Sequence, residues 1–118
     1  EAMKYIHEAE TLMLENDFYD QAHTYNLFGN ILYDMGEYAQ ALEYYKKAMK
    51  DKQAAQTSSI VYAHLGYARI LMQQNKQPEA ILLLKQGIAI SYARVNAIHR
   101  NELYENLSTC YEQSHQEI

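Results

Sequence analysis

Residues 25–49 carry two amphipathic segments on either side of a glycine. The first segment places apolar or small residues three or four positions apart, at Tyr25, Phe28, Gly29 and Leu32. The second segment follows Gly36 and repeats this spacing at Ala41, Tyr45 and Ala48. Residues at such intervals share one face of an α-helix. The pattern therefore predicts two antiparallel helices that approach closely where one glycine and two alanines leave room.

This two-helix pattern recurs along the chain with a period of 39 residues. Second-helix positions superimpose as Ala2 on Ala41 and Ala80, Ile6 on Tyr45 and Leu84, and Ala9 on Ala48 and Gly87. First-helix positions superimpose as Phe28 on Tyr67, Gly29 on Ala68 and Leu32 on Leu71. One more residue of shift aligns the first-helix face again, at Tyr104, Leu107, Ser108 and Tyr111. A period sustained this far predicts a solenoid, in which each hairpin buries its apolar face against its neighbours.

The periodic segments predict six helices, each antiparallel to its neighbours in sequence: 1–14, 18–35, 38–52, 57–74, 78–93 and 97–114. We expect Gly36 and Asn75 to follow two of these helices in a left-handed conformation, which glycine and asparagine adopt most readily. Pro78 then falls in a first helical turn, where its missing N–H is not needed. Polar residues that favour helix N-termini are expected to cap the others: Asn16, Asp17, Thr57, Ser58, Ser59 and Asn96.

The hairpin of residues 25–49 resembles the tetratricopeptide repeat, whose signature is an aromatic residue, Leu-Gly and Tyr, followed by Ala-x3-Phe-x2-Ala. Leu32 stands where the family usually has Tyr. The resemblance implies an all-α fold, a right-handed superhelix of six antiparallel helices in one domain of residues 1–118. Residues 1–14 would then be the second helix of a preceding repeat, 18–52 and 57–93 two whole repeats, and 97–118 the first helix of a further repeat.

The repeat is about five residues longer than the roughly 34 that are usual in the family. In this respect it is similar to the repeats of bacterial peptide-pheromone receptors and of bacterial sensor regions. The resemblance thus implies a scaffold that binds proteins or peptides, expected to be a fragment of a larger bacterial sensor or regulatory protein. The alternative is a structural spacer or self-associating solenoid segment with no ligand in its groove. Peptide binding that is lost when Arg69 is replaced would separate the two.

Composition and charge narrow the classes of partner. The 118 residues suffice for one domain, and 48 % of them are aliphatic, aromatic or otherwise apolar, as in a folded helical protein. The net charge of −5 comes without a basic stripe, which argues against nucleic acid. No apolar run approaches the roughly 20 residues that span a membrane, so we expect no membrane insertion. We expect a cytoplasmic protein, but the single Cys110 leaves the compartment open and the start at Glu1 leaves room for a removed upstream segment, so a periplasmic or extracellular sensor region stays an alternative.

No motif points to catalysis, and we expect neither an enzyme nor a cofactor or metal site. The five histidines lack the i, i+4 pairing and the His-Glu-x-x-His spacing of zinc sites. Neighbouring carboxylates have the spacing of solvated helix faces rather than of a pair across a cleft: Glu8 and Glu10, Asp17 and Asp20, Glu102 and Glu105. Gly29 and Gly87 have a packing reason in the repeat, whereas Gly66 has none that the pattern reveals.

In proteins with this repeat, the first helix of each hairpin lines a concave groove that receives a peptide. Carried over position by position, the expected groove residues are Asn26, Asn30, Tyr33, Tyr62, Leu65, Arg69, Glu105 and Thr109, together with His23, Met72, Glu102 and Glu112. Asn can bond a peptide backbone, Tyr offers contact area, and Arg pairs with a carboxylate. The alternative for each residue is a solvated inner face. The Lys, Asn and Arg clamp of chaperone-binding relatives is matched only by Asn30, which disfavours a C-terminal carboxylate as ligand.

The twelve tyrosines divide between core and surface. By the repeat alignment, the expected core set is Tyr25, Tyr45, Tyr67, Tyr104 and Tyr111. Helix 97–114 is expected to lack its hairpin partner and to leave an apolar patch facing water, at Leu103, Leu107, Cys110 and Tyr111. Helix 1–14 of another copy is expected to cover this patch, head to tail, in an association that does not close on itself.

Overall fold

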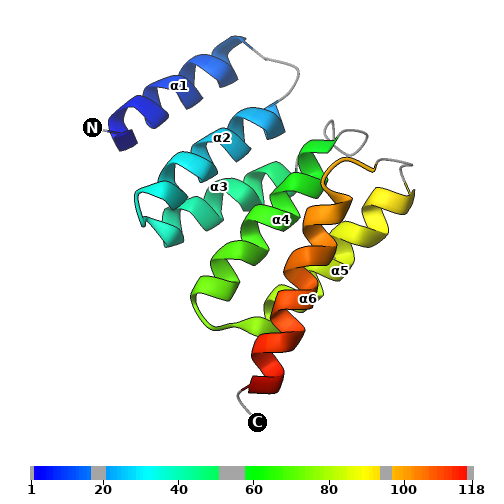
Figure 1. Cartoon of the computed structure of the whole chain (residues 1–118). Coiled ribbons are helices and arrows are strands. Elements are labelled where there is room, and N and C mark those ends of the chain that lie inside the picture. Colours follow the sequence, from blue (N-terminus) through cyan, green and yellow to red (C-terminus); the bar gives the residue numbers. More distant parts are fainter. Residues whose placement is uncertain (1, 17–20, 51–57, 94–96, 117–118) are drawn as a thin grey trace.

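The computed structural model describes residues 2–16, 21–50, 58–93 and 97–116, and these ranges contain six α-helices and no strand (Figure 1). The helices are α1 (Ala2–Asn16), α2 (Gln21–Asp34), α3 (Tyr38–Lys50), α4 (Ser58–Gln73), α5 (Gln77–Ala93) and α6 (Arg100–Gln116). The predicted all-α fold of six helices is confirmed. The helix bounds differ from the expected ones by no more than a few residues.

Helices that follow one another in sequence lie side by side, and together they form an elongated stack of 49 by 35 by 17 Å (Figure 1). α2 pairs with α3, and α4 with α5, as antiparallel hairpins, while α4 also lies against α2 and α3. α6 packs on α5, and α1 lies beside α2 at the opposite end of the stack. Each helix therefore buries its apolar face on its neighbours in sequence, which is the construction of a helical solenoid.

Two turns of the same geometry close the two hairpins. Gly36 has a φ of 78° and Asn75 a φ of 60°, so both adopt the predicted left-handed conformation. After each turn a main-chain N–H bonds back into the preceding helix: Glu37 N to Leu32 O at 2.9 Å, and Lys76 N to Leu71 O at 2.8 Å. These bonds satisfy carbonyl groups that a helix end would otherwise leave open.

The predicted helix starts are less accurate than the predicted turns. Pro78 does fall in the first turn of α5. Asn16, however, is the last residue of α1. Ser58 and Ser59 lie within the first turn of α4. The other predicted caps lie outside the described residues: Asp17, Thr57 and Asn96. Polar residues occur throughout these connections, so their identity locates a helix start only to within a few residues.

The side chain of Tyr45 fills the junction between the two hairpins. It is fully buried, and its ring lies against a glycine of α2 and a glycine of α4. A Cβ atom on Gly29 would lie 2.7 Å from the ring of Tyr45, and a Cβ atom on Gly66 would lie 2.6 Å from it. Both distances are far shorter than van der Waals contact, so a residue larger than glycine has no space at either position. Gly66 thus has a packing reason that the repeat pattern did not reveal.

The apolar residues of α6 are buried in a way that corrects the expected open patch. Leu103 and Cys110 are both fully buried in a cluster formed with α4 and α5. The reason is the rotation of the helix. Leu103 and Cys110 immediately precede Tyr104 and Tyr111 in sequence, so the two pairs lie on neighbouring faces of the helix. α6 directs Leu103 and Cys110 toward the preceding hairpin. Leu107 is partly buried against the same cluster.

The predicted tyrosine core is correct for residues within the two complete hairpins. Tyr25 and Tyr45 are buried, and Tyr67 is partly buried against both apolar clusters. Tyr104 and Tyr111 were also expected in the core, but they are 44 % and 42 % exposed. In the described part of the chain no second helix lies over them, as α3 lies over α2.

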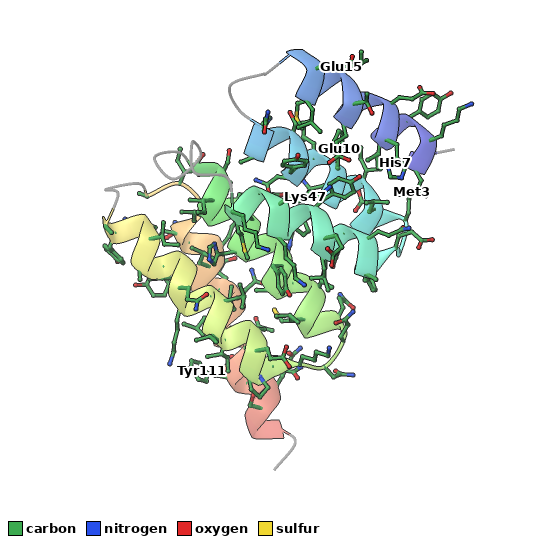
Figure 2. The ribbon with its side chains drawn as sticks, turned by 180° about the vertical axis from the view of Figure 1, so that it is seen from behind. Met3, His7, Glu10, Glu15, Lys47 and Tyr111 are labelled. Carbon is green, nitrogen blue, oxygen red and sulfur yellow. The ribbon has the colours of Figure 1, made fainter. Side chains whose placement is uncertain are left out.

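α1 is held by buried apolar residues and by two hydrogen bonds that Glu10 accepts; Figure 2 shows Glu10 and Lys47 from behind. Ile6 and Met13 are buried in the first apolar cluster. Glu10 accepts a hydrogen bond from the Tyr44 hydroxyl at 3.1 Å and another from Lys47 Nζ at 2.8 Å. Burial, reinforced by the bond to Glu10, raises the pKa of Tyr44 to about 12. Tyr44 therefore remains a neutral donor near neutral pH and anchors α1 to α3.

Candidate functional site

A pocket of about 300 Å³ opens between α2 and α4. Asn30 and His23 of α2 line it, together with Ser59 and Tyr62 of α4. His99, which precedes α6, completes the wall, and its ring packs edge-on against Tyr62 with 5.0 Å between the ring centroids. The volume lies at the lower end of the range for ligand sites, so the pocket has room for one or two side chains of a larger ligand.

Asn30 is oriented by two tyrosine hydroxyls. Its Oδ1 accepts hydrogen bonds from the hydroxyl of Tyr45 and, at 3.2 Å, from the hydroxyl of Tyr62. Because the side-chain amide is planar, the Nδ2 group then points away from both hydroxyls. Asn30 lines the pocket and is only partly buried. The arrangement therefore presents two N–H donors to whatever occupies this surface.

A cation lies next to this polar cluster. Cζ of Arg69 lies 5.6 Å from the centroid of the Tyr33 ring, and Gln73 Nε2 donates to the Tyr33 hydroxyl at 3.4 Å. Arg69 also lies near the Tyr45 hydroxyl. Burial raises the pKa of Tyr45, the neighbouring Tyr62 raises it further, and Arg69 lowers it. Among the described residues no carboxylate lies within ion-pair distance of Arg69, and its Nε is buried without a hydrogen-bond partner. Arg69 therefore lies beside the Tyr33 ring and the Tyr45 hydroxyl, with no carboxylate of the described residues to neutralise its charge.

Asn26 has a structural task between the same two helices. Its exposed fraction is only 4 %, and its Nδ2 donates to the main-chain oxygen of Ser59 at 2.9 Å. The bond ties the middle of α2 to the first turn of α4. Asn26 Oδ1 is buried and has no partner among the described residues. We therefore regard Asn26 as a link between the two helices beneath the pocket rather than as a surface group.

Two further properties of the described residues bear on the chemistry. They contain no group of three His, Cys, Asp or Glu side chains placed to hold a metal ion. None of their helices is both long and apolar enough to cross a membrane.

The geometry of two stacked helical hairpins can be compared with known families. A family model for the tetratricopeptide repeat matches residues 20–93, which include both hairpins and the residues around Asn30. The chain belongs to the tetratricopeptide repeat family. No curated protein and no solved structure matches it. Tetratricopeptide repeats are typically non-catalytic scaffolds that mediate contacts between proteins, and the family suggests this general role for the present chain.

The tetratricopeptide register places only part of the expected groove set on one surface. Polar and ring contacts bring together Asn30, Tyr33, Tyr62 and Arg69. Leu65 was expected to line the groove, but it is fully buried in the second apolar cluster, so the surface position assigned to it is wrong. Asn26 does line the pocket, with a side chain that is only 4 % exposed.

The groove residues that were expected on α6, the first helix of the third repeat, do not line this pocket. Glu105 and Thr109 are exposed on α6, where Thr109 Oγ1 donates to the main-chain oxygen of Glu105 at 3.0 Å. Glu102 lies 3.3 Å from Nδ1 of His99. The contribution of this part of the chain to the pocket comes from His99, which has a φ of 69°.

Three participants were missed at the level of sequence: the Tyr45 hydroxyl, His99 and Gln73. Tyr45 was recognised as a core residue, but the tetratricopeptide pattern does not indicate that its hydroxyl crosses the core to reach Asn30. Gln73 lies 40 positions after Tyr33, so with a period of 39 residues it is the equivalent of Asp34 and lies one position beyond the equivalent of Tyr33. That offset was the available signal for a contact between successive first helices. No comparable signal exists for His99.

His64 is a buried titratable group in α4 of this tetratricopeptide protein. Its exposed fraction is 7 %, and its Nδ1 lies 2.8 Å from the main-chain oxygen of Ile60. Because a carbonyl oxygen only accepts, Nδ1 carries the proton in this contact. Burial lowers the pKa of His64, and the bond to Ile60 opposes the shift only in part. The folded protein therefore disfavours the protonated form of His64.

We expect stability to fall as the pH drops below about 6.5, the ordinary pKa of histidine. Below that pH the unfolded chain binds a proton at His64 more readily than the folded chain does, so protons favour unfolding by at most about 1.4 kcal/mol per pH unit. Urea unfolding between about pH 8 and pH 5, on either side of that pKa, measures the slope. His64→Gln should reduce this slope. An unchanged slope in His64→Gln would contradict the burial argument.

Proposed function

We propose that the surface formed by α2 and α4 binds an extended peptide segment of a partner protein. The observation that carries the proposal is the orientation of Asn30. Two tyrosine hydroxyls donate to its oxygen, which leaves the N–H donors to other partners, and its side chain lines the pocket between α2 and α4. Membership in a family of protein-binding scaffolds supports the same reading.

The polar groups of this surface define the chemistry of the ligand. Asn30 Nδ2 can donate to a main-chain carbonyl, which every peptide has and which gives affinity without sequence preference. Arg69 can form a forked pair with a carboxylate, so we infer that the peptide carries Asp or Glu close to the bound carbonyl. Tyr33 and Tyr62 add ring area at a small cost in side-chain entropy. The ligand is thus an acidic segment rather than a basic one.

The proposal is tested by selecting peptides from a random display library on the 118-residue chain and measuring their affinities by calorimetry. Arg69→Ala should weaken the selected peptides by about 10- to 100-fold, since hydrogen bonds to charged groups contribute about 1.5–3 kcal/mol. Lys50→Ala removes an exposed cation from α3 and should leave the affinity unchanged. Peptides without acidic residues, or peptides that bind Arg69→Ala as tightly as the unmodified chain, would contradict the proposal.

We further propose that this binding serves a bacterial sensor or regulatory protein in the cytoplasm. The support is the period of 39 residues, because repeats of this length are similar to those of bacterial peptide-pheromone receptors and sensor regions.

A second candidate is a solenoid segment that associates with copies of itself. One observation favours it: large apolar side chains are exposed at both ends of the stack, among them Tyr5 at 68 % and Tyr111 at 42 %. This candidate concerns surfaces away from Asn30.

A further inference from the structure

The pocket between α2 and α4 is polar but has no permanently charged wall. Its described lining residues carry no carboxylate, ammonium or guanidinium group: they are asparagines, serines, histidines, one tyrosine and one leucine, and Arg69 is not one of them. A charged side chain placed there would lose part of its hydration and would meet no permanent opposite charge. The pocket therefore favours an uncharged, polar group of the ligand.

His99 supplies a hydrogen-bond acceptor, and its ring is held from two sides. Its Nδ1 lies 3.3 Å from a carboxylate oxygen of Glu102, and the ring packs edge-on against Tyr62. Because a carboxylate only accepts hydrogen bonds, Nδ1 carries the proton in this contact. The other ring nitrogen of the neutral imidazole, Nε2, is then an acceptor. His99 can thus accept a hydrogen bond from a group in the pocket that its ring lines.

Asn26 supplies a second acceptor, and this one has no partner. Its side chain lines the pocket but is only 4 % exposed, and its Nδ2 is engaged by the main-chain oxygen of Ser59. Its Oδ1 is buried without a hydrogen-bond partner among the described residues. A buried acceptor without a partner costs free energy, and an N–H group of a ligand that reaches it removes that cost. Asn26 is therefore independent evidence that the pocket takes a donor.

Asn30 supplies the donor of the pocket. It lies one turn after Asn26 on α2, so both side chains share a face of the helix. Its Oδ1 accepts from the hydroxyls of Tyr45 and Tyr62, whereas its Nδ2 carries two N–H groups. One N–H can serve the main-chain carbonyl of the proposed peptide, and the other remains for a second acceptor.

A side-chain carboxamide matches this set of groups, because it is neutral and both accepts and donates. We infer that the pocket binds an asparagine or glutamine side chain of the peptide, next to the acidic residue at Arg69. Its carbonyl accepts from Asn30 Nδ2, and its two N–H groups serve the two acceptors, Asn26 Oδ1 and His99 Nε2. A hydroxyl has a single O–H and serves only one of them. This inference rests on the proposed function and adds a specificity to the same site.

Peptides selected from a random display library on the 118-residue chain test the inference. Asparagine or glutamine should be enriched at one position close to the acidic residue. In a selected peptide, an apolar residue of similar size at that position should weaken binding by about 10-fold, the effect of one or two lost hydrogen bonds. The acid of the same length should weaken binding at least as much, since it lacks the N–H donors. Calorimetry on the unmodified chain measures both ratios.

His99→Asn is the matching change in the chain. Asparagine tolerates the φ of 69° at this position, and its shorter side chain withdraws the imidazole from the pocket. The preference for the amide over the apolar residue should then fall from about 10-fold to about 3-fold or less. His7→Asn removes an exposed imidazole of α1 and should keep the full preference. Circular dichroism shows whether each variant is folded, and the peptide series on the unmodified chain decides the matter even if one is not.

The outcomes separate this inference from the proposed function. Acidic peptides that depend on Arg69 but show no preference for an amide would overturn the inference and leave the proposed function standing. A preference for the acid or the apolar residue, or an undiminished preference for the amide in folded His99→Asn, would also overturn it. A library that yields no binding peptide would overturn both.

Discussion

Replacing Tyr45 by Ala is expected to destabilise the fold by about 3–5 kcal/mol, as for other large buried aromatic residues. The Tyr45 side chain has no exposed surface, and its ring is held between Gly29 and Gly66. With the ring removed, neither glycine has a side chain that can move into the space, so a cavity remains between the two hairpins. Urea unfolding measures the change in the free energy of unfolding.

Tyr45→Phe is the matched control for this variant. It keeps the ring between the glycines and removes only the hydroxyl that donates to Asn30. The expected loss is about 1 kcal/mol, the usual net contribution of one hydrogen bond. If Tyr45→Ala were no more harmful than Tyr45→Phe, the ring would not be what fills the junction.

Gly66→Leu is expected to destabilise the protein by about 1–3 kcal/mol through overpacking. The Cβ atom alone would lie 2.6 Å from the Tyr45 ring, and Gly29 closes off the opposite side of that ring. The clash must outweigh a gain of up to about 1 kcal/mol, because glycine is a poor residue for the middle of a helix. Thermal melting followed by circular dichroism should therefore show a lower midpoint than for the unmodified chain.

Ala39→Leu provides the comparison, since it enlarges an exposed residue of α3. A surface substitution of this kind should change stability by no more than about 0.5 kcal/mol. A Gly66→Leu protein that melts at or above the temperature of Ala39→Leu would show that the ring of Tyr45 can move aside. It would also remove the packing reason assigned to Gly66.

The hairpins were predictable from the sequence because their signals are local. Gly36 and Asn75 are the two residue types that tolerate positive φ, and both adopt it. The spacing of small and large residues identified the helix faces within one hairpin. Gly66 escaped this reasoning because its contact with Tyr45 joins two successive hairpins, and such a contact has no signature in the periodicity of either one.

The candidate site was less predictable for a related physical reason. A first helix touches its own second helix, the preceding hairpin and the following one, so three faces are covered instead of one. Asn26 and Leu65 occupy equivalent positions. Spacing alone assigns both to the concave side, yet both are buried. Asn30 and Arg69, also equivalent to one another, lie just beyond the buried zone. A shift of one residue around the helix moves a side chain from the core to the surface. The repeat period does not determine the rotation of a helix with that accuracy.

Tyr45 contributes both to the packing of the two hairpins and to the proposed peptide site. Its ring sets the distance between α2 and α4, while its hydroxyl fixes the orientation of the Asn30 amide. The same side chain therefore stabilises the junction of the hairpins and positions the donors of the proposed peptide site. Tyr45→Phe is thus expected to weaken peptide binding even though the fold persists.

The most direct test of the peptide site is a nitrogen-15 NMR titration of the chain with a peptide selected on it. The side-chain NH₂ signal of Asn30 should shift strongly, together with main-chain signals of α2 and α4 around Tyr33, Tyr62 and Arg69. Signals of α3 and α5 near Lys50 and Leu82 should change little. Shifts confined to α3 and α5, with the Asn30 NH₂ signal unmoved at saturation, would contradict the assignment of the peptide site to the α2–α4 surface.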